Sequence, residues 1–199
     1  MHIQPHTQRG RVHASTRLES ADPQGEPMLQ SGDLAPLFSL PDADMEIFDL
    51  ASLRGKQHVV LYFYPRDNTP GCTLQATDFS DREGDFAAHD CTVIGISPDD
   101  CLTHAQFRDD HGLAVRLLSD QETEVCQLYD VWRAREVDGL RKMGVLRSTF
   151  IIDKDGVVRH VLYNVSPRGH AAAVFNLVKQ LNTRNSNGNS QEHRRNPQV

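Results

Sequence analysis

Residues 58–72 of the chain read HVVLYFYPRDNTPGC. Residues 58–64 form an apolar run rich in β-branched and aromatic side chains, which is typical of a strand buried on both faces of a sheet. The run stops at Pro65, and a turn-rich segment leads from there to Cys72. Polar, helix-compatible sequence follows the cysteine. The stretch therefore predicts a central strand, a stiff loop, and a cysteine where a helix begins.

Strand and helix patterns alternate through the rest of the body. The expected strands cover residues 92–97, 116–118, 148–152 and 157–163, and the expected helices cover residues 73–89, 98–111 and 122–129. Residues 153–156, DKDG, predict a tight hairpin turn. A last helix is indicated by apolar residues at i, i+3, i+4 and i+7, namely Val174, Leu177, Val178 and Leu181. The pattern predicts an α/β fold with a final antiparallel hairpin and a closing helix.

The length of 199 residues suits one domain with polar ends. The first 30 residues are polar with scattered Gly and Pro, and the last stretch is rich in Asn and Arg. We therefore expect a folded domain over residues 31–182, between disordered tails at residues 1–30 and 183–199.

Composition argues against several classes of function. The net charge is −6 and no basic stripe crosses the middle of the chain, which argues against nucleic acid as a partner. No apolar run has the length of a membrane span, so no membrane partner is expected. The ten histidines show no recognised ligand spacing, and no glycine-rich phosphate loop occurs. We therefore expect neither a metal nor an organic cofactor.

The four cysteines, at positions 72, 91, 101 and 126, form no CxxC pair and no regular spacing. The N-terminus has no apolar segment of the kind that a secretory signal carries. We therefore expect a cytoplasmic protein whose thiols stay reduced, rather than a disulfide framework. Most of these cysteines should be small buried side chains.

Cys72 differs from the others by its place between a buried strand and a helix. The N–H groups of a first helical turn have no intrahelical partner, and the helix dipole is positive there, so a thiolate is stabilised. The carboxyl ends of sheet strands are also where ligands bind in α/β folds. From position alone, Cys72 is either a nucleophile or a small residue that fills a helix start.

The motif PxxxTxxC, here Pro65, Thr69 and Cys72, resembles the peroxidatic motif of peroxiredoxins. The longer string at residues 62–79, YFYPRDNTPGCTLQATDF, resembles the bacterioferritin-comigratory, or Q-type, subfamily. Further similar blocks follow in the right order over residues 32–181, namely GDLAPLFSL, VIGIS, LLSD, VW and RSTFIIDKDGVVRHV.

This resemblance implies a thioredoxin-like fold with a central mixed β-sheet flanked by helices. It also implies reduction of hydrogen peroxide and organic hydroperoxides, with Cys72 attacking the peroxide and becoming a sulfenic acid. Thr69 would bind the peroxide, Pro65 would shield the pocket, and Arg147 would face the cysteine. Backbone N–H groups near Gly71 would help to stabilise the oxygen that leaves. Without the resemblance, Arg147 would be interpreted as a solvated charge at a strand edge.

The chain departs from the subfamily at Thr77, because a resolving cysteine often stands at that place. Cys101, at the start of the next helix, is a candidate substitute, whereas Cys91 and Cys126 favour core roles. The leading hypothesis is a one-cysteine mechanism with a thioredoxin-like protein or a small thiol as the reductant, in a monomer or a homodimer. The alternative is a redox sensor or binding protein on the same scaffold that passes its oxidation to a partner.

Overall fold

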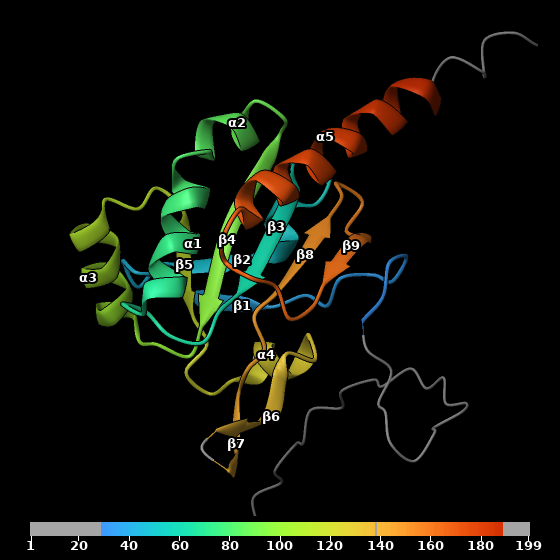
Figure 1. Ribbon diagram of the computed structural model, residues 1–199. Helices are drawn as coiled ribbons and strands as arrows, with labels where there is room; N and C mark the ends of the chain where they lie inside the picture. The colour runs from blue at the N-terminus through green and yellow to red at the C-terminus, as the bar shows by residue number, and fades with distance from the viewer. Residues whose placement is uncertain (1–28, 138, 189–199) are drawn as a thin grey trace, which may run out of the picture.

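The computed structural model describes residues 29–137 and 139–188. Its centre is a mixed five-stranded sheet (Figure 1), whose strands are β3 (His58–Phe63), β4 (Cys91–Ser97), β5 (Arg116–Ser119), β8 (Ser148–Ile152) and β9 (Val158–Leu162). The strand order is β5-β4-β3-β8-β9. β3 pairs in parallel with β4 and antiparallel with β8, while β4 and β5 are parallel and β8 and β9 antiparallel. The predicted mixed sheet and its central strand are confirmed.

The apolar run of β3 serves two hydrophobic cores at once. Val59, Leu61 and Phe63 point into one cluster of buried side chains. Val60 and Tyr62 point into a second cluster on the opposite face. Because successive side chains of a strand alternate between faces, a central strand covered on both sides has no position that faces solvent.

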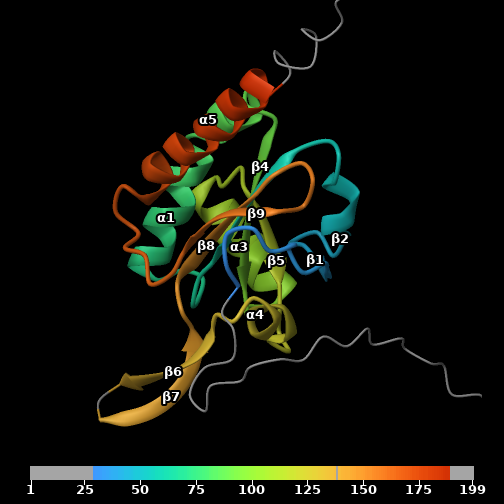
Figure 2. The ribbon, with the colours of Figure 1, turned by 90° about the vertical axis from the view of Figure 1, so that its right-hand side faces the viewer.

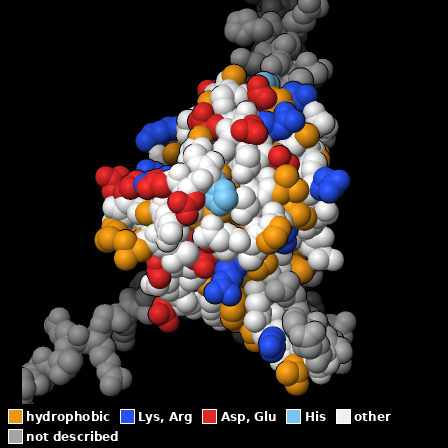
Figure 3. All heavy atoms as spheres, turned by 60° about the vertical axis from the view of Figure 1, so that its left-hand side comes forward, with side chains coloured by type: hydrophobic (Ala, Val, Ile, Leu, Met, Phe, Trp, Pro, Cys, Tyr) orange, Lys and Arg blue, Asp and Glu red, His pale blue; other side chains and the backbone are white. Residues whose placement is uncertain are grey.

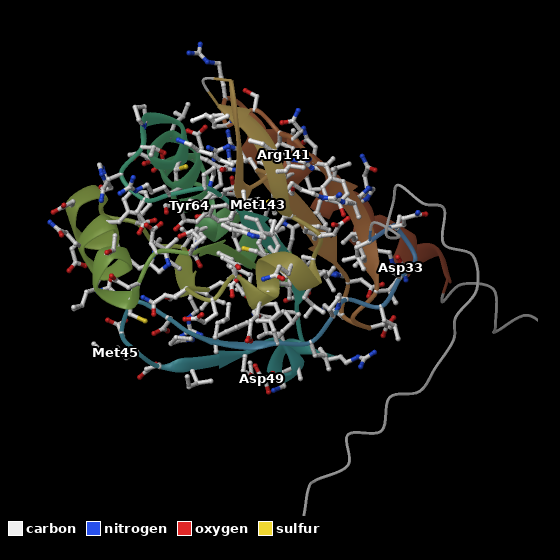
Figure 4. All side chains as sticks on the ribbon, turned by 90° about the horizontal axis from the view of Figure 1, so that it is seen from below. Asp33, Met45, Asp49, Tyr64, Arg141 and Met143 are labelled. Atoms are coloured by element: carbon white, nitrogen blue, oxygen red, sulfur yellow. The ribbon has the colours of Figure 1, made fainter. Side chains whose placement is uncertain are left out.

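Two layers cover the sheet (Figure 2). One face carries α1 (Pro70–Ser80), α2 (Glu83–Ala87) and α5 (His170–Gly188), and α3 (Cys101–His111) adds Phe107 to the same core beside β5. The other face carries the short hairpin β1 (Ser39–Pro41) and β2 (Ile47–Asp49), the 3-10 helix η1 (Leu50–Leu53) and α4 (Glu124–Leu128). Tyr64 lies inside the body, whereas Met45 and Asp49 lie at its periphery (Figure 4).

The helix expected over residues 73–89 is two helices in the structure. α1 begins earlier, at Pro70, where a missing N–H costs nothing because the first turn has no intrahelical acceptor. It ends at Ser80, and α2 begins at Glu83. The last helix, α5, extends to Gly188, which is beyond the boundary expected at residue 182. The rest of the two predicted tails lies outside the described residues.

A second hairpin, β6 (Trp132–Val137) and β7 (Leu140–Val145), was not expected from the sequence. It projects from the lower end of the body and carries Arg141 and Met143 (Figures 1 and 4). Polar and apolar residues are mixed on β7, and Leu140 through Met143 are exposed. Most of β7 therefore lies outside the core, which only Val145 at its end enters, so the alternation that identifies a strand in a sequence is missing.

The surface on the α3 side shows acidic and basic side chains interspersed, with small hydrophobic patches (Figure 3). Over the part of the chain that the structure describes, no helix combines the length and the apolar character needed to cross a membrane.

Candidate active site

Cys72 is the third residue of α1, directly after the loop that leaves β3. Its side chain is buried, with 2% of its surface exposed. The backbone N–H of Thr73 donates to the carbonyl of Thr69 at 2.8 Å, so the N–H groups of Gly71 and Cys72 precede the helical hydrogen-bond ladder. These groups and the positive end of the helix dipole favour a negative charge on the sulfur.

Arg147 lies between β7 and β8 and reaches back to the start of α1. Its Nη2 donates to the Sγ of Cys72 at 3.2 Å. A Cβ atom on Gly71 would lie 3.5 Å from the same Nη2, an ordinary van der Waals distance, so the start of α1 and the guanidinium lie side by side. The structure thus brings Cys72, Gly71 and Arg147 together, although Cys72 and Arg147 are 75 residues apart in the sequence.

Gln75 is a site residue that the sequence analysis missed. It is fully buried one helical turn after Cys72, and its Oε1 accepts a hydrogen bond from Nη1 of Arg147. Its Nε2 has no hydrogen-bond partner among the described residues. The sequence gives one indication of this role: Gln75 is three residues after Cys72, and residues at i and i+3 lie on the same face of a helix.

Thr69 and Pro65 lie on the loop before α1 and are half-buried. Thr69 is the N-cap of α1 with an extended backbone, and its hydroxyl donates to the carbonyl of Arg66 at 3.2 Å. It lines a polar hollow formed by residues 66–69 and 98–100. Among the described residues neither Thr69 nor Pro65 makes a hydrogen bond to Cys72. What links them to the cysteine is the loop between β3 and α1, on which both lie.

Two titratable groups behind the site are held neutral near pH 7. Burial, together with the smaller effect of the charge of Arg147, lowers the pKa of His170 to about 4. Nε2 of His170 lies 2.8 Å from the hydroxyl of Thr149. Burial raises the pKa of Tyr62, and the negative charges of Asp67 and Cys72 add to that effect. Neither His170 nor Tyr62 therefore carries a charge near pH 7, whereas Arg147 is a cation that donates to the sulfur.

All four cysteines are free thiols. Cys91 and Cys126 are buried, as predicted. Burial raises the pKa of the Cys91 thiol to about 12, and burial and Asp120 raise the pKa of Cys126. Cys101 is the half-exposed first residue of α3.

Within the residues that the structure describes, no group of three or more His, Cys, Asp or Glu side chains could hold a metal ion. The groups that the structure does place together at this point are the thiol, the guanidinium and the backbone N–H groups of the first helical turn.

Comparison with known proteins shows the family of the chain. The sequence profile of the AhpC/TSA family matches residues 31–161. Peroxiredoxin Bcp of Bacillus subtilis is 38% identical over 153 residues, which is 77% of this chain and 97% of that protein. Peroxiredoxin Bcp of Escherichia coli is 38% identical over 152 residues, covering 76% of this chain and 97% of that one.

Solved structures give the same result. Peroxidoxin BcpB of Mycobacterium tuberculosis superposes with a TM-score of 0.69 at 33% identity, over 77% of this chain and 98% of that chain. A cysteine-to-serine mutant of Xylella fastidiosa PrxQ superposes with a TM-score of 0.74 at 28% identity, over 79% of this chain and 99% of that chain. The thioredoxin-like fold is confirmed. The chain therefore belongs to the AhpC/TSA family and is a peroxiredoxin, a thiol-dependent peroxidase, of the bacterioferritin-comigratory (Q-type) group.

Proposed function

We propose that Cys72 is the residue that attacks the peroxide. The observation that carries this assignment is the 3.2 Å contact between Arg147 Nη2 and the sulfur, at the first turn of a helix. The thiolate attacks one oxygen of ROOH, the S–O bond forms as the O–O bond breaks, and RO⁻ leaves and takes up a proton. The sulfur is oxidised to a sulfenic acid, and the peroxide is reduced to ROH.

Arg147 and the first-turn N–H groups act on the charge that moves during this step. The guanidinium stabilises the thiolate before attack and the leaving oxygen during it, because both are anionic. Its contact with Gln75 holds it in one orientation. Gly71 contributes its backbone N–H, which precedes the helical hydrogen-bond ladder.

Thr69 binds and orients the peroxide through its hydroxyl, which can both donate and accept. In the free protein this hydroxyl is held by the carbonyl of Arg66. Pro65, on the loop between β3 and α1, shields the pocket from water and limits further oxidation of the sulfenate.

The sulfenate returns to a thiol by a one-cysteine route. Thr77 stands where a resolving sulfur is often found, and the two buried thiols, Cys91 and Cys126, have raised pKa values that disfavour the attacking thiolate. An external thiol, from a thioredoxin-like protein or a small molecule, forms a mixed disulfide with Cys72 and releases water. A second external thiol then releases Cys72 and leaves as the disulfide. Free thiols suit a reducing compartment such as the cytoplasm.

Intact mass without reductant, after one equivalent of hydrogen peroxide, tests this route. The expected product is a monomer that has gained one oxygen and forms an adduct with a sulfenate-trapping reagent at Cys72. A monomer that has lost two hydrogens contains an internal disulfide and contradicts the one-cysteine route. If Cys101→Ser then abolishes that loss, Cys101 is the resolving residue.

A redox sensor is the second candidate function, and the threonine at position 77 favours it, because a long-lived sulfenate can be transferred to a partner protein. Turnover separates the two. An enzyme consumes many equivalents of peroxide with an excess of thiol reductant, whereas a sensor stops after about one.

A further inference from the structure

The loop between β3 and α1 has a buried carboxylate in its middle. Asp67 is 4% exposed, although it lies on a loop of polar residues that leads to Cys72. Its Oδ1 accepts a hydrogen bond from the hydroxyl of Tyr64 at 2.7 Å. Its backbone N–H donates to Oδ2 of Asp99 at 2.8 Å. A carboxylate is costly to bury unless each oxygen has a partner, so the remaining oxygen needs one as well.

That partner is His104 of α3, which is fully buried. Its Nδ1 lies 2.7 Å from Oδ2 of Asp67, and its Nε2 donates to the carbonyl of Leu118 on β5 at 3.1 Å. The ring therefore connects the loop before α1 with a strand of the central sheet. No part of the peroxidase chemistry described above uses this pair.

The loop turns sharply directly after Asp67. Asn68, the next residue, has a φ of +56°, a left-handed conformation that asparagine tolerates in tight turns. Thr69, the N-cap of α1, follows directly, and its hydroxyl donates a hydrogen bond to the carbonyl of Arg66 on the other side of Asp67. A shift of Asp67 therefore changes the position of the hydroxyl that orients the peroxide.

We propose that His104 is a positioning residue for the peroxide reaction: by holding Asp67 it fixes the loop that presents Thr69 beside Cys72. The inference rests on the proposed roles of Cys72 and Thr69. His104 lies on another helix, 32 residues after Cys72 in the sequence, and under this inference it helps to orient the peroxide.

Two conservative substitutions separate the two hydrogen bonds of the ring. The amide nitrogen of Asn occupies roughly the place of Nδ1, so His104→Asn keeps a donor for Asp67 and loses the bond to Leu118. The longer Gln reaches toward the place of Nε2, so His104→Gln keeps the bond to Leu118 and loses Asp67. Each variant loses one of the two buried hydrogen bonds, and neither neutral amide can carry the charge of a ring that donates through both nitrogens, so the two variants are matched controls for stability.

Two reactions of Cys72 are measured for each full-length variant. Oxidation by hydrogen peroxide needs the oriented Thr69 hydroxyl, whereas alkylation by iodoacetamide needs only the thiolate. We expect His104→Gln to lower the second-order rate constant with peroxide by roughly tenfold or more, because small displacements of orienting groups have effects of that order. Its iodoacetamide rate, and both rates of His104→Asn, should stay within about threefold of wild type.

Equal peroxide rates in the two variants would overturn the inference, and so would equal losses in both reactions, which indicate only a weakened fold. If neither His104 variant folds, Tyr64→Phe removes the other hydrogen bond to Asp67 and should give the same peroxide-selective loss; an unselective loss overturns the inference. A wild-type protein inert to peroxide would instead remove the proposed role of Cys72.

Discussion

Replacement of Arg147 by methionine is expected to slow the oxidation of Cys72 by about 10- to 150-fold. The substitution keeps an unbranched side chain of similar length but removes the donor 3.2 Å from the sulfur. A hydrogen bond to a charged group contributes about 1.5–3 kcal/mol, and each 1.4 kcal/mol changes a rate about tenfold. Little of Cys72 is exposed, so water replaces the lost donor poorly. The helix N-terminus keeps part of the stabilisation, which is why some reactivity should remain.

The rate constant can be measured at pH 7 by competition for hydrogen peroxide with a haem peroxidase of known rate. Arg159→Met is the matched control. Arg159 lies on the edge strand β9, pairs with Asp153 after β8, and has no hydrogen bond to Cys72 among the described residues. An Arg147→Met protein that reacts within twofold of wild type would refute the reasoning. An equal loss in the control would refute it as well, because the effect would then be one of general stability.

Three further predictions concern groups around the site. A Cβ on Gly95 would lie 2.6 Å from the ring of Tyr62, which is fully buried, so Gly95→Ala should lower the free energy of unfolding in urea by about 1–3 kcal/mol. Gly84→Ala is the control, because a Cβ at that position meets open space, and it should not lower the stability. Equal effects of the two substitutions would contradict the prediction. Folding lowers the pKa of His170 from 6.5 to about 4. Between these two pH values the unfolded chain binds a proton that the folded protein does not, so the free energy of unfolding decreases as the pH falls from 6.5 toward 4. His170→Gln should make that decrease smaller by up to about 3 kcal/mol in urea titrations at pH 7.5 and 4.5, and an unchanged pH dependence would argue against it. Because burial raises the pKa of Cys91 to about 12, this thiol should resist a disulfide reagent at pH 8 until the protein unfolds; rapid labelling in the native state would contradict its placement.

The sequence predicts the centre of the fold well, because each core element has its own local pattern. The run at residues 58–64 requires a strand covered on both faces, and β3 is that strand. The apolar spacing of Val174 to Leu181 matches the buried face of α5. Most of β7 lies outside the core, so no periodic pattern indicates the hairpin of β6 and β7.

The site is less predictable, because it depends on contacts between distant segments. The place of Cys72 at a helix start follows from local sequence. The contact with Arg147 was expected only through the family resemblance, since β7 and the loop before β8 determine how that side chain is directed. Gln75 and the Asp67–His104 pair were missed, because burial of a polar residue is decided by tertiary packing and not by its neighbours in sequence.

Peroxide consumption by wild type, Cys72→Ser and Cys101→Ser, in the presence of a thiol reductant, tests the assignment of the nucleophile most directly. We predict that the wild type and Cys101→Ser turn over many equivalents of hydrogen peroxide and that Cys72→Ser consumes none above background. Turnover that survives in Cys72→Ser would contradict the proposed role of Cys72.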